Sequence, residues 1–313
     1  MGRILVSFGV DVDAVAGWLG SYGGEDSPAD ISRGMFAGEV GVPRLLKLFS
    51  KHGIKTSWFI PGHSLDTFPE QLAAVRDAGH EIGLHGYSHE NPTSLSLEQQ
   101  RDILDRTWDQ MVAFTGKAPE GSVAPWWEAS AEGTKLLLEK GIRYDHSLQH
   151  RDATAYFVRI NDTWKKIDYD QPAASWMEPV QRGQETGLVE IPVSWDLDDL
   201  PPMLFMKSAA NSHGFVDAHV IEQKWKDWFE YLWENERAEG FVMPITIHPD
   251  VSGRPRECAK RSTLTADVLQ MLDRFITWVN THEGVEWVTF AEIKRDFRAR
   301  NKPSEGALMP KGV

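Results

Sequence analysis

Residues 81–89 read EIGLHGYSH, an apolar run followed at once by two histidines, His85 and His89. The run 81–84 is short and mostly aliphatic, a pattern that is typical of a buried strand. The histidines stand at positions i and i+4, which would place both on one face of a helical turn and let both reach one metal ion. Taken alone, this spacing is common on protein surfaces and indicates little.

Two other predicted strands end beside groups of the same chemistry. The apolar run 4–8 precedes Asp11 and Asp13, and the apolar run 241–247 precedes His248. In an extended chain the two aspartates would point the same way and lie ~6–7 Å apart. Each pattern alone is weak, but three of them at strand ends predict a shared site. A carboxylate with two imidazoles suits a divalent metal, and a spare carboxylate and imidazole suit a base and an acid.

The rest of the chain alternates strand-like apolar runs with helix-like periodic ones. The patterns predict strands over 4–8, 55–60, 81–84, 122–125, 143–148, 188–194, 241–247 and 285–290. They predict helices over 41–52, 68–78, 96–116, 129–139, 216–238, 263–281 and 291–300, the third of which opens with a capping box. The stretch 20–38 is too rich in glycine and serine to be assigned to either state.

Seven or eight strand–helix units follow one another without an internal boundary. This alternation predicts an α/β fold in one domain, a (β/α)7-8 barrel over residues 1–300, with a flexible tail over 301–313. Such a barrel would gather the three strand ends at its carboxyl-terminal face. Two separate open-sheet domains are the alternative.

The composition excludes several classes of function. The 313 residues are 41% hydrophobic with 13 Trp, which suffices for a large core, and the net charge of −13 argues against a nucleic-acid partner. Cys258 is the single cysteine, so no intrachain disulfide is expected and the thiol is expected to be inert. There is no leader before the first strand and no apolar stretch near the ~20 residues that span a bilayer. We therefore expect a soluble, cytoplasmic protein with no membrane partner.

The chain resembles the polysaccharide deacetylase family, carbohydrate esterase family four, from Ile4 to about Phe297. The motifs that carry the resemblance are 7–13, 59–63, 81–91, 195–201, 245–249 and 253–255. The resemblance implies a distorted seven- or eight-stranded β/α barrel and a metal, most plausibly Zn²⁺, held by Asp13, His85 and His89. It also implies Asp11 as general base and His248 as general acid, with the metal and the backbone of 61–63 stabilising the oxyanion.

Two departures from the family pattern point to a branch within it. Val12 separates aspartates that are adjacent in most members, and Val123 stands where many members have an arginine that holds the base. Arg254 or Arg33 is a candidate to replace that arginine. Both departures, with the segment 253–255, resemble a divergent intracellular branch that contains peptidoglycan-deacetylase-like proteins and cyclic imide hydrolases.

The implied activity is hydrolysis of C–N bonds outside peptides, with an N-acetylated amino sugar of chitin or peptidoglycan as substrate. The alternatives are ring-opening of a small cyclic imide or ureide, and an inactive carbohydrate-binding homologue. Trp126, Trp127, Asp199 and Arg254 are the candidates to bind substrate or support the site. An open groove would favour an oligosaccharide and a lidded pocket would favour a small molecule. By analogy with the branch, we expect a homo-oligomer.

Overall fold

The computed structural model describes residues 2–23, 27–206, 212, 214–255 and 268–312. Its centre is a nine-stranded sheet in the order β6-β7-β5-β4-β3-β2-β1-β8, with β9 also paired to β1. The strands are β1 (Ile4–Asp11), β2 (Ser57–Ile60), β3 (Glu81–Leu84), β4 (Gly121–Ser122), β5 (Tyr144–Asp145), β6 (Tyr156–Ile160), β7 (Gln184–Glu190), β8 (Phe241–Ile247) and β9 (Val285–Trp287).

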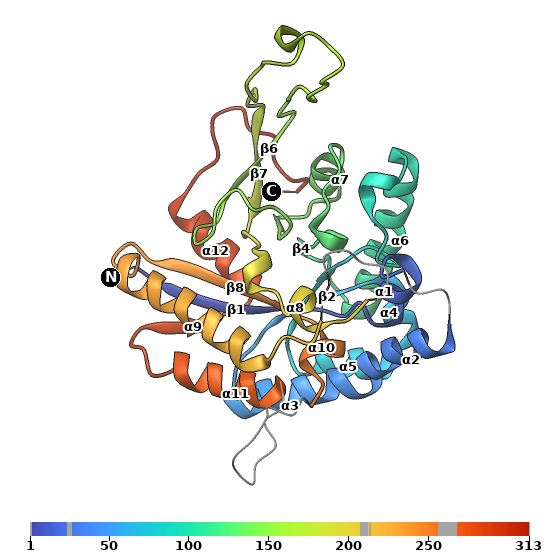
Figure 1. The fold of residues 1–313 in the computed structure, drawn as a ribbon, viewed down its shortest axis with the longest axis vertical. Coiled ribbons are helices and arrows are strands. Elements are labelled where there is room, and N and C mark those ends of the chain that lie inside the picture. The colour runs from blue at the N-terminus through green and yellow to red at the C-terminus, as the bar shows by residue number, and fades with distance from the viewer. Residues whose placement is uncertain (1, 24–26, 207–211, 213, 256–267, 313) are drawn as a thin grey trace.

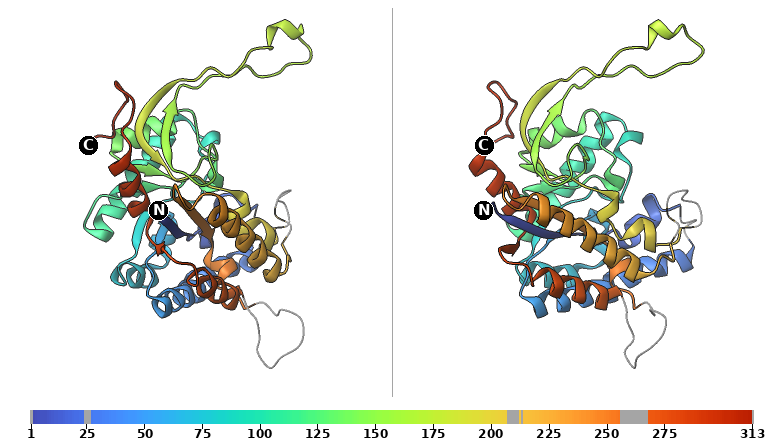
Figure 2. Two further views of the ribbon diagram at one scale, coloured as in Figure 1. Left: turned by 90° about the vertical axis from the view of Figure 1, so that its left-hand side faces the viewer. Right: turned by 60° about the vertical axis from the view of Figure 1, so that its left-hand side comes forward.

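The sheet curls into an incomplete barrel, as Figures 1 and 2 show, with most helices outside it. Every strand pair is parallel except β6 with β7. An isolated parallel bridge joins Asp198 to Thr246 in β8, so the two ends of the sheet approach each other beyond the last residues of β7. The predicted single α/β barrel is confirmed, in a form whose sheet does not fully close.

Helices cover the outer face wherever the sequence shows an apolar stripe. In α3, for example, the buried residues are Val42, Leu45, Leu48 and Phe49, and Gly53 ends the helix in the left-handed conformation. The α-helices of the described residues, α3 included, are α1 (Ala14–Gly20), α2 (Pro28–Phe36), α3 (Val42–His52), α4 (Gly62–Thr67), α5 (Pro69–Asp77), α6 (Leu97–Thr115), α7 (Gly133–Lys140), α8 (Leu200–Met203), α9 (Ala218–Asn235), α10 (Pro249–Ser252), α11 (Val268–Val279) and α12 (Phe290–Arg300).

Several predicted boundaries need correction. The glycine-rich stretch forms α2, which Ser27 caps through the backbone N–H of Asp30, and then a π-helical turn, η1 (Ala37–Gly41). The fourth and fifth strands are only two residues long each, and β6 was not predicted at all. Cys258 and the start of the predicted helix 263–281 lie outside the described residues.

The hairpin of β6 and β7 continues into a long arm, residues 161–183, which projects away from the barrel (Figure 2). The bridge between Thr163 and Gln181 pairs its two sides beyond the sheet. Within it, large apolar side chains face solvent: Trp164, Ile167, Tyr169, Met177 and Val180. The arm has no counterpart in the predicted barrel.

The terminal segment packs against the barrel, which corrects the expectation of a flexible tail. The backbone N–H of Gly187 donates to Leu308 O at 2.8 Å, and that of Lys311 donates to Leu138 O at 2.9 Å. The Ser304 N–H donates to the Glu185 carboxylate at 2.6 Å. The first of these bonds satisfies a backbone group of β7, where Leu308 also forms a parallel bridge with Thr186, and the second joins the segment to α7.

The fold brings the three motifs together because their strands are neighbours. All eight residues of β1 are buried, and β1 lies between β2 and β8. Val10 pairs with Ile247 and Asp11 with Phe59, so β1 and β8 end side by side. Among the described residues, no helix has the length and apolar character needed to cross a bilayer.

Candidate metal centre

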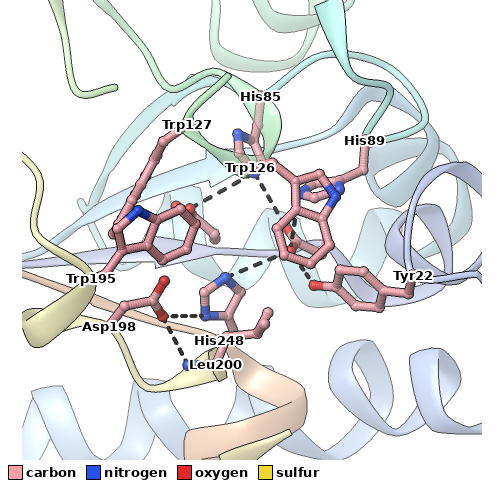
Figure 3. A pocket seen from close by; sticks show the side chains of 11 residues that line it. Tyr22, His85, His89, Trp126, Trp127, Trp195, Asp198, Leu200 and His248 are labelled. Carbon is pink, nitrogen blue, oxygen red and sulfur yellow. Dashed lines mark hydrogen bonds and ion pairs between the residues drawn. The ribbon is translucent and has the colours of Figure 1, made fainter. Parts of the chain in front are cut away.

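A single cavity of about 290 Å³ lies at the carboxyl ends of the strands. It brings together the five groups that the sequence singled out, Asp11, Asp13, His85, His89 and His248 (Figure 3). The other lining residues are Tyr22, Trp126, Trp127, Trp195, Asp198 and Leu200. Three strand ends and two long loops therefore build one site.

Asp13, His85 and His89 have the geometry of a metal triad. The Nε2 atom of His85 lies 3.1 Å from Asp13 Oδ1, and that of His89 lies 3.2 Å from Asp13 Oδ2. All three side chains are buried and their candidate ligand atoms lie within 4.8 Å of one another. Two imidazoles with one carboxylate leave positions open for water and substrate, as catalytic metal sites do.

The other ring nitrogens of the histidines are held by the protein, which leaves both Nε2 atoms available. Nδ1 of His85 lies 2.8 Å from the carbonyl oxygen of Val123, and Nδ1 of His89 lies 2.5 Å from Ser21 Oγ. Such outer contacts fix the tautomer and the ring orientation of a metal ligand. His85 Nε2 and Asp13 Oδ1 are buried without a hydrogen-bond partner among the described residues, as ligand atoms awaiting a cation would be.

The loop that carries the two histidines is not helical, which corrects the expectation of a helical turn. His89 has φ of 58°, and Gly86 has φ of 65°. The carboxylate of Glu90 orders the loop by accepting from the backbone N–H groups of Tyr87 at 3.0 Å and Ser88 at 2.6 Å. Left-handed backbone at a non-glycine residue costs energy and is often found at functional sites.

Asp11 is the carboxylate left over after the triad. Its Oδ2 lies 3.7 Å from His85 Nε2, and its Oδ1 is buried with no hydrogen-bond partner among the described residues. Burial raises the pKa of Asp11 above its ordinary value, while the neighbouring charges of His85 and His248 oppose that rise.

No arginine in the described part of the chain forms an ion pair with Asp11, contrary to the expectation that Arg33 or Arg254 would hold it. The Arg33 guanidinium lies 4.0 Å over the Trp18 ring and donates to Phe205 O, and that of Arg254 lies 4.2 Å over Phe36. Arg254 also donates to the backbone oxygen of Asp250 and is not among the residues lining the cavity. Val123 is buried, so the strand end that carries an arginine in other members is apolar here.

His248 is held by the carboxylate of Asp199. Its Nδ1 lies 2.7 Å from Asp199 Oδ1, and its backbone N–H donates to the same carboxylate, which also accepts from Ser252 Oγ. Its Nε2 therefore faces the triad, 3.6 Å from Asp13 Oδ2. Burial would lower the pKa of His248, but the bond to Asp199 and the nearby carboxylate charges raise it well above the ordinary value.

Asp198, Asp199 and His248 form a second acid–imidazole cluster, but it is a poor metal site. Both oxygens of Asp199 already accept hydrogen bonds, and Asp198 Oδ1 accepts from the Leu200 N–H at 2.8 Å. Three carboxylate oxygens of this cluster are therefore occupied, whereas Asp13 Oδ1 and His85 Nε2 of the triad have no hydrogen-bond partner among the described residues.

Aromatic rings wall the cavity. Trp126 contacts His89 at a centroid distance of 5.9 Å and Tyr22 at 5.6 Å, and Trp127 packs on Trp195 at 4.4 Å. Trp126 and Trp127 have φ of 59° and 53°, so this turn is held in a left-handed conformation to present both rings. Aromatic rings therefore bound the cavity beside the proposed metal ligands.

Sequence reasoning missed Tyr22 and Asp198 and misplaced the oxyanion donors. The Tyr22 hydroxyl donates to Asp13 Oδ2 from within the glycine-rich stretch, where no motif marks it. Asp198 lies in the quoted 195–201 motif, which was its available signal. The N–H groups of Gly62 and His63 already donate to the carbonyls of Gly86 and Tyr87, so they have no free donor for an oxyanion.

The curled β/α barrel holds three candidate metal ligands that leave coordination positions open, with a further carboxylate and imidazole beside them. This combination is typical of metal-dependent hydrolases. The model of the polysaccharide deacetylase family matches residues 32–144. A peptidoglycan deacetylase of Helicobacter pylori is 56% identical over 299 residues, covering 96% of this chain and 98% of that protein. The chain belongs to the polysaccharide deacetylase family.

Two further similarities extend over nearly the whole chain. A Gibberella zeae protein described as peptidoglycan deacetylase-like is 41% identical over 305 residues, covering 94% of this chain and 86% of that protein. A solved Mycobacterium smegmatis structure, assigned to the polysaccharide deacetylases, has a TM-score of 0.78 at 26% identity, covering 97% and 94% of the two chains. Like its family, the protein is a metal-dependent hydrolase of C–N bonds other than peptide bonds.

Proposed function

We propose that this chain removes acetate from an N-acetylated amino sugar of peptidoglycan, with Zn²⁺ as its metal. Asp13, His85 and His89 are the proposed ligands, Asp11 the base and His248 the acid. The observation that carries the proposal is their convergence on one cavity, with free ligand atoms on the triad. The near-full-length similarity to a peptidoglycan deacetylase supports the substrate class.

A bound divalent cation would supply Lewis-acid polarisation of the acetyl carbonyl and a more acidic water. Asp11 accepts the proton of the attacking water, since its carboxylate lies beside the triad, with Oδ2 3.7 Å from His85 Nε2 and Oδ1 without a hydrogen-bond partner among the described residues. His248, held protonated by Asp199, donates its Nε2 proton to the departing nitrogen. The hydrogen bond between Nδ1 and Asp199 fixes the ring so that Nε2 faces the scissile bond.

The indole walls fit the same reaction. Trp126 and Trp127 provide flat apolar faces on which a sugar ring stacks, and their contacts with His89 and Trp195 exclude water from the reacting atoms.

The test is acetate release from a peptidoglycan fragment by zinc-loaded protein. Asp11→Asn should keep the metal and lose roughly 10²- to 10⁴-fold in turnover, the range that general base catalysis contributes. His85→Ala should lose the metal as well. Near-full activity of Asp11→Asn would overturn the base assignment.

The same assay separates the alternatives, which the relatives do not favour. Ring-opening of a small cyclic imide without acetate release would replace the proposed substrate. Bound metal with hydrolysis of neither substrate would identify an inactive homologue.

We also infer that the chain assembles with copies of itself through the arm 161–183. Monomeric proteins rarely expose so many large apolar side chains on one projection. The arm has contacts of its own, because Thr163 pairs with Gln181 and Tyr169 packs edge-on against Trp176 at 5.8 Å. The arm is thus a surface that a second copy of the chain could cover, since most oligomers of soluble proteins are built from identical chains. Sedimentation at a multiple of 35.4 kDa would support this inference.

A further inference from the structure

A second and larger cavity, of about 740 Å³, lies beside the metal centre. It is bounded by α6, α7 and the carboxyl ends of β3 and β4, and the segment 123–125 lines it next to the metal site. Its walls are mostly aliphatic, formed by Leu84, Leu95, Ile103, Leu104, Leu136 and Leu137. Mostly apolar cavities with a few polar groups are the usual form of small-molecule sites.

Among the described residues, the charged groups that line this cavity are two acids, Glu90 and Asp145. Glu90 is satisfied by the backbone N–H groups of its own loop. Asp145 is different, because its side chain is buried at 6% exposure and its Oδ1 has no hydrogen-bond partner among the described residues. A buried carboxylate oxygen without a donor is costly, so this position suits a ligand that brings one.

A second buried acid adjoins Asp145. Glu190, in the neighbouring strand β7, is buried, and its Oε2 also has no hydrogen-bond partner among the described residues. Burial raises the pKa of Asp145 to about 7, although hydrogen bonds from Ser147, His146 and Ser122 oppose the rise. Burial and the neighbouring Asp145 raise the pKa of Glu190 well above its ordinary value. An ammonium group placed against Asp145 would favour its ionised form, and none of the described lining residues is basic.

We propose that this cavity is a second ligand site, for a small molecule with a compact apolar body and one protonated amino group that reaches Asp145. The aliphatic walls take the body, and the unpartnered carboxylate oxygen accepts from the ammonium group. This inference does not depend on the identity of the substrate at the metal centre.

Occupancy of the second cavity acts on the metal centre through their shared wall. Val123 lines the second cavity, and its carbonyl oxygen holds His85 Nδ1 at 2.8 Å. Gly86 and Glu90 also line it, and Glu90 orders the loop between His85 and His89. A ligand that presses on these residues changes how the two imidazoles are placed, and therefore changes turnover.

Benzylamine is the probe for this site, and benzyl alcohol is its uncharged counterpart. The full chain is first stripped of metal, so that the amine cannot bind to a metal ion. It is then titrated with each compound in a calorimeter. Benzylamine should bind with a dissociation constant of about 1 mM, as a ligand of this size permits, and benzyl alcohol should bind at least tenfold more weakly.

Two variants locate the binding. Asp145→Asn removes the charge and should weaken benzylamine at least tenfold while leaving benzyl alcohol unchanged. Thr134→Phe fills the cavity from α7 and should abolish the binding of both, which keeps the test valid if Asp145→Asn fails to fold. With metal restored, saturating benzylamine should change acetate release at least twofold in the native chain and leave Thr134→Phe unaffected.

Equal affinity for benzylamine in the native chain and in Thr134→Phe would overturn the site. So would a failure of benzylamine to bind at all, or equal binding of the amine and the alcohol. Loss of acetate release from every protein, with benzylamine binding intact, would contradict the proposed substrate and leave the second site standing.

Discussion

At the scale of single residues, the proposed chemistry depends on a carboxylate that binds His248 through the ring nitrogen facing away from the reacting atoms. Asp199 does not itself line the cavity, yet it accepts hydrogen bonds from both the ring and the backbone N–H of His248, which does. A carboxylate in that position favours the imidazolium form and aims Nε2 at the site. Asp199 is thus a positioning residue for the proposed acid.

Asp199→Asn should shift the alkaline limb of the pH–rate profile to lower pH. The general acid must be protonated, and the Asp199 charge helps to raise the pKa of His248 well above its ordinary value against the opposing effect of burial. Removing the charge lowers that pKa, so the acid form is lost earlier as pH rises. The check is kcat/KM against pH. Ser252→Ala, which removes a donor to Asp199 and keeps its charge, should move the limb far less.

Metal uptake should release about one proton near neutral pH. Burial would lower the pKa of His85, but the charge of Asp11 and the close contact with the Asp13 carboxylate, 3.1 Å away, raise it to about 9. The metal-free ring therefore carries a proton at pH 7.5 that a ligand must give up. Apparent affinity should rise with pH and level off above about 9. Zinc titrations in two buffers with different ionisation enthalpies measure the release, and identical heats in both would contradict it.

At the scale of elements, close backbone approach holds the metal loop against α1. A Cβ on Gly20, the last residue of α1, would lie 1.7 Å from the carbonyl oxygen of Ser88, so no side chain fits there. The adjoining Ser21 holds His89 Nδ1, so the end of this helix positions a proposed ligand in two ways. The helix α1 is short, and it helps to place His89 through these contacts with the loop.

Gly20→Ala should therefore weaken zinc binding roughly 10- to 100-fold, the usual effect of disturbing the supports of a ligand. Gly53→Ala is the matched control. Gly53 has φ of +67° with nothing within 4 Å of a built Cβ, so the change should cost about 1 kcal/mol of stability and leave zinc affinity intact. Competition with a chromophoric chelator measures the affinity. Equal affinity in the two variants would show that the contact with Ser88 does not matter.

The sequence predicts elements well where burial is continuous and poorly where tertiary contacts decide. The strands β1 and β8 are mostly apolar and buried throughout, and they were found because both faces of each are covered. The two-residue strands β4 and β5 are too short to show any period, and α2 lies in a glycine-rich stretch. The predicted site residues gather at one cavity except for Asp199 and Arg254, whereas Tyr22 reaches Asp13 only through a tertiary contact.

At the scale of the whole molecule, the barrel explains the position of the site but not the arm. The arm adds a hairpin to the outer edge of the sheet, where β6 is the last strand. Edge strands are normally protected from pairing with other chains. A projection that carries exposed aromatic rings would instead promote association, unless another copy covers it. The proposed roles of the two parts therefore differ: assembly for the arm and chemistry for the barrel.

Replacing Trp164 and Tyr169 together with serine should reduce the mass of the assembly in sedimentation. These side chains are 72% and 85% exposed, so the folded monomer loses almost no packing from the change. The interface, in contrast, would lose two large aromatic anchors, which commonly dominate association energy. Tyr231→Ser, on α9 of the barrel and 61% exposed, is the control and should leave the mass unchanged. A double variant that sediments like the native chain would exclude the arm as the interface, and a native chain of 35.4 kDa in solution would exclude self-assembly itself.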